Sequence, residues 1–158
     1  MQHIYEKNLT FDVERFIQKI NPNTKLAVVS NPSHTGTVLS ENEIIQIAKK
    51  AKSNNSLLLI DEAYHNFYPG TMVNYVDRFE NLVITRTFSK AFGLASLRIG
   101  LLIGCKKIIN ELYKVKLVHE ITGVAAKIGS YFIDHMDLVD QYVNEVNQGK
   151  NVLYKRLG

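Results

Sequence analysis

The sequence has little cysteine and no long apolar run. Its single cysteine, Cys105, excludes an intrachain disulfide and cannot by itself build a cysteine metal site. No apolar stretch reaches the roughly 18 residues that a membrane-spanning helix needs, and the first residues do not have the pattern of a secretory signal peptide. These absences predict a protein without a membrane span, and we expect it to be cytoplasmic.

Blocks of charge of one sign are also missing. The formal net charge is +4, but the 19 lysines and arginines are spread along the chain rather than gathered in one segment. Neither an aromatic-rich RNA motif nor a zinc-like spacing of histidines accompanies them. We therefore expect no nucleic-acid partner and no metal site. A hydrophobic content of 46% in 158 residues is typical of one globular unit with a sizeable core.

Four short apolar runs predict the strands of a sheet. Continuous runs at 26–29, 57–60 and 82–84 are typical of strands that are buried on both faces, as in a parallel sheet. The fourth run, at 99–103, follows the third too closely for a helical crossover, so we expect it to be antiparallel. The sequence predicts an α/β fold of three layers, with a mostly parallel sheet flanked by helices.

Capping signals and helical spacing predict the helices. Ser40 and Glu43 match a capping box, which predicts a helix that ends at Asn54. Thr10 is a candidate N-cap for a helix before the first strand. The remaining helical patterns cover residues 13–20, 72–79, 108–117 and 124–153, the last as one long helix.

Polar residues follow each of the three parallel strands. The carboxyl ends of parallel strands share one edge of the sheet, which is where open α/β sheets bind ligands. An amine and a guanidinium there are costly to desolvate unless an anionic, electrophilic partner lies between them. The pattern predicts a ligand site where the polar loops at 30–36, 61–64 and 85–90 converge, together with Arg98.

The segment R-T-F-S-K-A-F-G-L-A-S-L-R-I-G, at 86–100, resembles the active-site lysine segment of fold-type I pyridoxal-phosphate enzymes. It is most similar to that of class I and II aminotransferases of the histidinol-phosphate aminotransferase kind, and it departs from their pattern by Ser96, where glycine is usual. The string D-E-A-Y, at 61–64, matches a second motif of the same family without a gap. The resemblance implies pyridoxal 5'-phosphate as the cofactor.

The resemblance also implies a role for each matching residue. Lys90 would bind the cofactor aldehyde covalently and then act as the general base. Asp61 would keep the ring nitrogen protonated, and Tyr64 would donate to the phenolic oxygen of the ring. The cofactor phosphate would be held by hydroxyl and guanidinium donors, namely Thr87, Ser89 and Arg98.

The loop after the first strand departs from the family pattern. The family reads N-P-x-N-P-T-G, in which the second asparagine binds the phenolic oxygen, whereas this chain reads N-P-S-H-T-G. His34 lies nearest to that position, and a neutral imidazole donates one hydrogen bond as an asparagine does. Asn31 is the alternative, and a third reading is that His34 faces solvent.

The resemblance covers only the middle of a whole aminotransferase. It implies a partial cofactor-binding large domain at 1–122, followed at 123–158 by a long helix that leads towards an absent small domain. Exposed sheet edges would then favour self-association, for example as a homodimer. We expect the 158-residue chain by itself to turn over amino acids slowly or not at all.

Transfer of an amino group is the reaction that the resemblance implies. The substrates would be small molecules, an amino acid or amino-alcohol phosphate and a 2-oxo acid, as in amino-acid biosynthesis. A decarboxylase of the same fold is the alternative, because it shares these motifs. A non-catalytic fragment that keeps the fold is the second alternative.

Overall fold

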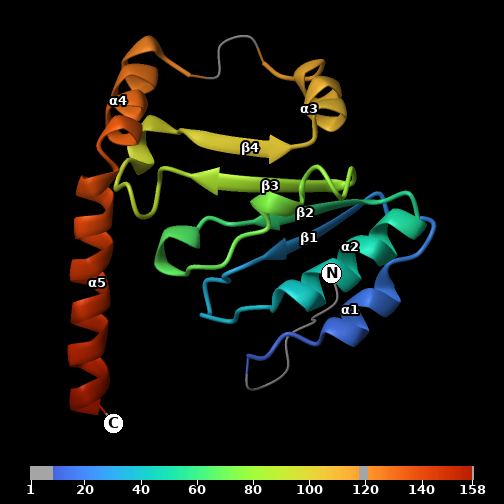
Figure 1. Ribbon diagram of the computed structural model, residues 1–158, viewed down its shortest axis with the longest axis horizontal. Helices are drawn as coiled ribbons and strands as arrows, with labels where there is room; N and C mark the ends of the chain where they lie inside the picture. The colour runs from blue at the N-terminus through green and yellow to red at the C-terminus, as the bar shows by residue number, and fades with distance from the viewer. Residues whose placement is uncertain (1–8, 118–120, 158) are drawn as a thin grey trace.

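The computed structural model describes residues 9–117 and 121–157, and within them the chain forms one four-stranded sheet (Figure 1). The strand order is β1-β2-β3-β4. The first three strands are parallel and the fourth is antiparallel to the third, as the sequence predicts. The strands are β1 (Leu26–Ser30), β2 (Leu57–Asp61), β3 (Leu82–Thr87) and β4 (Gly100–Gly104).

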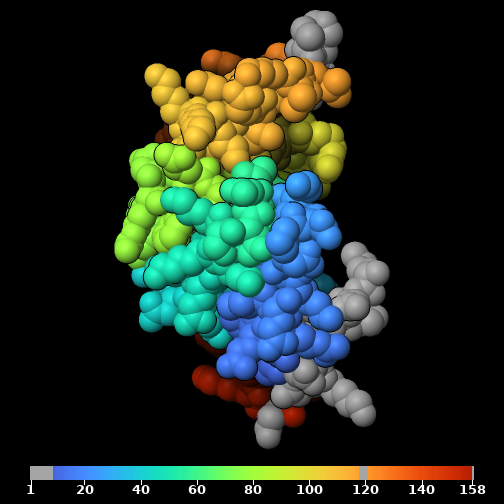
Figure 2. Space-filling view, turned by 90° about the vertical axis from the view of Figure 1, so that its right-hand side faces the viewer, coloured from blue at the N-terminus to red at the C-terminus, as the bar shows by residue number. Residues whose placement is uncertain are grey.

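Helices α1 and α2 alternate with the strands along the chain, and α3, α4 and α5 come after the last strand. Figure 2 shows α1 in blue and α2 in teal side by side on one surface of the molecule. Helix α5 stands at the end of the sheet where β3 finishes (Figure 1). The helices are α1 (Val13–Lys19), α2 (Glu41–Ser53), α3 (Lys106–Tyr113), α4 (Gly123–Asp134) and α5 (Met136–Leu157), with short 3-10 helices η1 (His65–Phe67), η2 (Val73–Tyr75) and η3 (Ala95–Leu97).

The main core lies between one face of the sheet and α2. Alternate strand residues, such as Leu58 and Ile84, are fully buried there against Ile47 and its neighbours on α2. We call this side the covered face. The intervening residues point to the opposite side, where Leu26 and Val28 are each 51% exposed. We call this side the open face.

Helix α3 covers part of the open face. Val83 of β3 packs there with Cys105 and Ile108 in a small buried cluster. Because Val83 alternates with the core residues of β3, this cluster lies on the side of the sheet opposite to α2. The chain therefore has helices on both faces, which agrees with the predicted layers.

The cap of α1 differs from the prediction. Asp12, not Thr10, is the N-cap, and its Oδ1 accepts a hydrogen bond of 2.8 Å from the N–H of Arg15. A carboxylate at this position also interacts favourably with the helix dipole. The capping box of Ser40 and Glu43 is confirmed, with both reciprocal hydrogen bonds present.

Three predicted helices have other bounds. The segment 72–79 forms only the short 3-10 helix η2 and turns, because its apolar spacing reflects the burial of Met72, Val76 and Phe79 in the core and not a helix. Helix α3 ends at Tyr113 rather than at 117. The single long helix predicted from 124 is two helices separated at His135, whose ring nitrogen Nδ1 lies 2.8 Å from the carbonyl of Tyr131 and so satisfies the end of α4.

No helix among residues 9–117 and 121–157 is long and apolar enough to cross a bilayer.

Candidate active site

The strand register decides which polar side chains share a face. Asp61 lies opposite Thr85 in the β2–β3 ladder. Both alternate with buried core residues of their strands, so they project from the open face, as does Thr87. Glu62 and Arg86, which follow Asp61 and Thr85, project from the covered face. The edge of the sheet thus presents two different sets of polar groups.

The carboxylate of Asp61 is held by two donors. Its Oδ1 accepts from the N–H of Ala63 at 3.1 Å and from the hydroxyl of Thr85 at 3.2 Å. The side chain is half-buried at the end of β2. These bonds fix the direction of the carboxylate, which is the requirement for a group that holds a proton at one atom of a ligand.

Lys90 and Tyr64 lie close together although they are 26 positions apart in the sequence. The Nζ of Lys90 is 5.2 Å from the centroid of the Tyr64 ring, within the range of a cation–π contact. Lys90 is exposed in the turn after β3, so its amine is accessible to a ligand. The structure therefore brings together two of the predicted site residues.

Helix α5 packs against the two loops that carry these residues. Phe67 of η1 and Ala91, which directly follows Lys90, pack in one cluster with Val139 and Val143 of α5. Ala91 and both valines are buried. This packing orders the loops on either side of the candidate site.

The segment between β3 and β4 curls back towards the end of β3. The N–H of Ser89 donates to the Thr87 hydroxyl at 3.1 Å, and Phe88 donates its N–H to the carbonyl of Ile99 at 3.1 Å. Arg98, next to Ile99, has a left-handed backbone with φ of 54°, and its exposed guanidinium donates to the carbonyl of Ala95. A left-handed arginine is a strained conformation of the kind found at functional sites.

The loop after β1 separates Asn31 from His34. Asn31 is buried, and its amide makes two hydrogen bonds to the backbone of Leu39, donating at 3.3 Å and accepting at 2.7 Å. This amide closes the loop. His34 is exposed. A ligand role for either residue stays a prediction, as does each of the other roles given above.

An ion pair that the sequence analysis missed lies beside the predicted residues. Glu62 is 1% exposed, and its Oε2 accepts from Nε of Arg86 at 3.0 Å and from Nη2 at 2.8 Å. Burial and the Arg86 guanidinium lower the pKa of the nearby His65, against an opposing effect of Glu62. The alternation of side chains along the strands could have indicated that Glu62 and Arg86 share the covered face, because each lies two residues after a core residue, Ile60 or Ile84.

The described residues contain no group of three or more histidine, cysteine or acidic side chains arranged to hold a metal ion. The site instead offers an amine, a carboxylate, a phenol, hydroxyls and a guanidinium. This donor set suits an anionic organic ligand with an electrophilic carbon.

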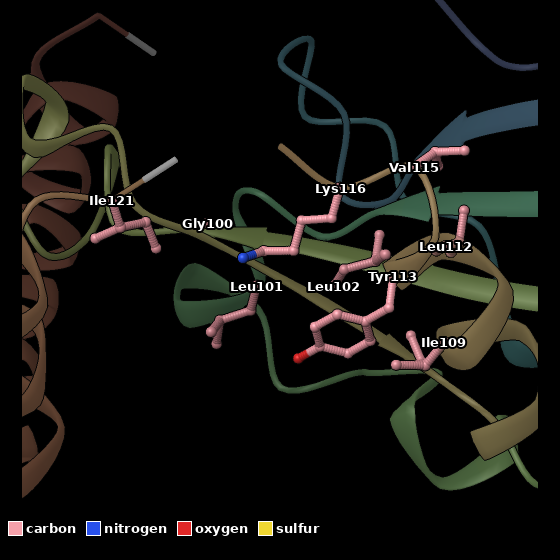
Figure 3. A pocket seen from close by; sticks show the side chains of 9 residues that line it. All are labelled: Gly100, Leu101, Leu102, Ile109, Leu112, Tyr113, Val115, Lys116 and Ile121. Atoms are coloured by element: carbon pink, nitrogen blue, oxygen red, sulfur yellow. The ribbon is translucent and has the colours of Figure 1, made fainter. Parts of the chain in front are cut away.

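A groove of about 510 Å³ lies elsewhere, between β4 and α3 (Figure 3). It borders the site through Gly100, which is opposite Thr87 in the β3–β4 ladder. Apolar side chains dominate its lining, and the ring of Tyr113 and the amine of Lys116 extend into it. The groove lacks the polar groups of the strand ends, so we do not assign the chemistry to it.

The family model described as "Aminotransferase class I and II" matches residues 2–157. A histidinol-phosphate aminotransferase from Caldanaerobacter subterraneus subsp. tengcongensis is 34% identical over 156 residues, which cover 89% of this chain and 44% of that protein. A second, from Clostridium novyi, is 32% identical over 154 residues, 96% of this chain and 42% of that protein. The chain thus spans less than half the length of these curated relatives.

A solved structure with the same fold contains the cofactor that the resemblance implies. It is the histidinol-phosphate aminotransferase of Sinorhizobium meliloti in complex with pyridoxal-5'-phosphate, with a TM-score of 0.77 and 24% identity. The match covers 91% of this chain and 40% of that one. At this identity the likeness establishes the fold.

Proposed function

Because the chain belongs to the aminotransferase class I and II family, we propose that it is the cofactor-binding part of a pyridoxal-phosphate-dependent aminotransferase. Its substrates would be an amino acid or amino-alcohol phosphate and a 2-oxo acid, in amino-acid biosynthesis. The curated relatives named above are histidinol-phosphate aminotransferases, which favours that substrate class.

One observation carries the proposal. The amine of Lys90 lies over the ring of Tyr64, and Tyr64 lies three positions after Asp61, whose carboxylate is oriented by Thr85 and Ala63. An accessible amine and an oriented carboxylate at one edge of a sheet are what an aldehyde cofactor with a ring nitrogen requires.

The residues present fit pyridoxal phosphate. When bound, this cofactor supplies an aldehyde that exchanges amino groups and a ring that accepts electrons while its nitrogen is protonated. Lys90 would hold the aldehyde carbon and then move the proton at the reacting carbon of the substrate. Asp61 would keep the proton on the ring nitrogen, and Tyr64 would donate to the phenolic oxygen.

The phosphate of the cofactor is a dianion, and it needs several donors. The hydroxyls of Thr87 and Ser89 and the guanidinium of Arg98 belong to one curled segment, as the hydrogen bonds of Phe88 and Ser89 indicate. His34, or otherwise Asn31, would take the place of the family's second asparagine. The exposure of His34 favours it over Asn31, whose amide already binds Leu39.

A decarboxylase of this fold would use the same residues. The curated relatives reported above are aminotransferases, so amino transfer is the favoured reaction. Product analysis with an amino acid as the substrate separates the two, because amino transfer converts it to a 2-oxo acid and decarboxylation releases its carboxylate as carbon dioxide.

Titration with pyridoxal phosphate tests the cofactor proposal. Once unbound cofactor has been removed by gel filtration, we expect the chain to retain an absorbance band near the visible edge and Lys90→Ala to lose it. Lys107→Ala is the matched control, because Lys107 is an exposed lysine on α3 that pairs with Glu80. A band that persists in Lys90→Ala would contradict the assignment, and a chain that develops no band would support the non-catalytic alternative.

For the partners and the location we make proposals. We expect the chain to self-associate through apolar edges of its sheet, such as Leu101 and Leu102 on β4, which are 44% and 46% exposed. A cytoplasmic location stays a prediction, which cell fractionation would test.

A further inference from the structure

The carboxylate of Glu62 is buried where β2 and β3 end. It receives two hydrogen bonds from Arg86, one from the hydroxyl of Thr71 and one from the N–H of Met72. Nη2 of Arg86 also donates to the Thr71 hydroxyl at 2.8 Å. A buried charge persists only when it is paired and hydrogen-bonded in this way.

The ion pair sits directly behind the candidate site. Glu62 follows Asp61, and Arg86 lies between Thr85 and Thr87. Successive strand residues point to opposite faces, so a bond between Glu62 and Arg86 on the covered face fixes the backbone from which the open-face side chains project. The N–H of Glu62 adds a hydrogen bond of 2.9 Å to the carbonyl of Thr85.

Glu62 also closes the loop that carries Tyr64. At the start of this loop, the carbonyl of Glu62 accepts from the N–H of His65 at 3.0 Å. At its end, the carboxylate of Glu62 holds Thr71 and Met72. Both ends of the loop are therefore tied to one residue, and Tyr64 lies between them.

We propose that the Glu62–Arg86 ion pair is a positioning device, which sets Asp61 and Tyr64 relative to Lys90 and thereby sets the affinity for pyridoxal phosphate. This inference rests on the proposed function. Stability alone does not explain the pair, because apolar residues of similar volume often replace a buried ion pair without loss of stability.

A double substitution, Glu62→Met with Arg86→Met, separates positioning from stability. It removes both charges together, so neither is left buried without a partner. Arg86→Lys is the second variant, since it keeps the charge but loses the planar fork of donors. Lys107→Met is the control, because it removes an ion pair with Glu80 whose side chains are 80% and 60% exposed.

Three properties of the 158-residue chain are measured for each variant. These are the thermal midpoint, the dissociation constant for pyridoxal phosphate from the visible-edge absorbance, and hydrogen exchange at the amide of Ala63. The last does not depend on the cofactor, because this amide donates to Asp61 at 3.1 Å in the chain itself.

We expect the double variant to stay folded with a lowered thermal midpoint, because the N–H of Met72 loses its acceptor, to bind pyridoxal phosphate about tenfold or more weakly, and to exchange the Ala63 amide faster. Arg86→Lys should show the same changes to a smaller degree, and it decides the outcome if the double variant does not fold. Lys107→Met should behave as the unsubstituted chain.

Unchanged exchange at Ala63 would overturn the positioning role, and so would an unchanged dissociation constant in a chain that takes up the cofactor. If the unsubstituted chain takes up no pyridoxal phosphate at Lys90, the proposed function fails instead. Exchange at Ala63 then decides the positioning role alone, with faster exchange in the variants supporting it.

Discussion

Arg98 combines a charged side chain with a backbone conformation that favours glycine. Its φ of 54° lies in the left-handed region, which costs a residue with a Cβ about 1 kcal/mol. The backbone conformation of Arg98 sets the direction of its side chain. The side chain is exposed, and its guanidinium donates one hydrogen bond, to the carbonyl of Ala95. We infer that the strain serves the phosphate role proposed for Arg98.

Two substitutions at Arg98 separate its charge from its strain. Arg98→Gly and Arg98→Ala both remove a charged donor, so we expect both to weaken pyridoxal phosphate binding about tenfold or more. Arg98→Gly should unfold at a higher temperature than Arg98→Ala, because glycine tolerates this φ. Absorbance titration and thermal unfolding measure the two effects. Equal cofactor affinity in both variants and the unsubstituted chain would exclude a phosphate role.

His65 predicts a pH dependence of stability. Burial and the Arg86 guanidinium lower its pKa from 6.5, so between that lowered value and 6.5 the unfolded chain binds more protons than the folded chain. The free energy of unfolding should therefore rise with pH through this window and fall as the solution becomes more acidic.

His65→Gln should flatten that slope below about pH 6.5 and leave it unchanged above. Denaturant unfolding across this range measures the effect. Measurements above about pH 7.5 serve as the internal control, because the ring is neutral there in both the folded and the unfolded chain. A slope that is identical in the variant would show that another group carries the pH dependence.

At the scale of elements, local signals predicted the strands but not every turn and helix end. The four apolar runs and the box of Ser40 and Glu43 lie within a few residues of sequence, and they gave correct strands and a correct start of α2. The segment after Met72 has a helical pattern because Met72, Val76 and Phe79 are buried in the core, yet it forms only the 3-10 helix η2. Burial alone produces this spacing, so the pattern did not distinguish a helix from a series of turns.

The candidate site shows the same division. Motifs around Lys90 and Asp61 predicted residues that the sheet does bring to one edge. The pair of Glu62 and Arg86 was not predicted, because strand alternation places both on the covered face but does not say which residues 24 positions apart will pair. Likewise, the break at His135, whose ring nitrogen Nδ1 lies 2.8 Å from the carbonyl of Tyr131, was not predicted.

The capping box supplies a test at this scale. Ser40→Ala removes the bond that the Ser40 side chain accepts from the N–H of Glu43, so we expect the free energy of unfolding to fall by about 1 kcal/mol. Ser53→Ala is the control, because Ser53 is exposed at the other end of α2 and its hydroxyl donates to a backbone carbonyl. Equal effects of the two substitutions in chemical denaturation would contradict the capping role.

At the scale of the whole molecule, the sheet leaves apolar surface uncovered on its open face and along β4. Leu26 and Val28 are exposed on the open face, and Leu101 and Leu102 on β4 border the groove of Figure 3. Exposed apolar strands are templates for pairing with another chain. The relative from Caldanaerobacter subterraneus is more than twice as long as this chain. In a protein of that length, additional residues can cover the surface that corresponds to the open face and β4.

Self-association of the 158-residue chain should therefore depend on β4. We expect Leu101→Lys to reduce it, because a charge on an edge strand opposes pairing. Tyr154→Lys is the matched control, since Tyr154 is exposed on α5, far along the chain from β4. Sedimentation velocity at several concentrations measures the change. A monomeric unsubstituted chain, or equal effects of both variants, would contradict this prediction.

The assignment of Lys90 as the residue that binds the cofactor underlies the whole functional account, and borohydride reduction tests it most directly. The chain is incubated with pyridoxal phosphate, reduced, digested and mapped by mass spectrometry. The account predicts a pyridoxyl label on the peptide that contains Lys90, well above that on exposed lysines such as Lys107. Labelling spread evenly over the surface lysines, or none at Lys90, would contradict it.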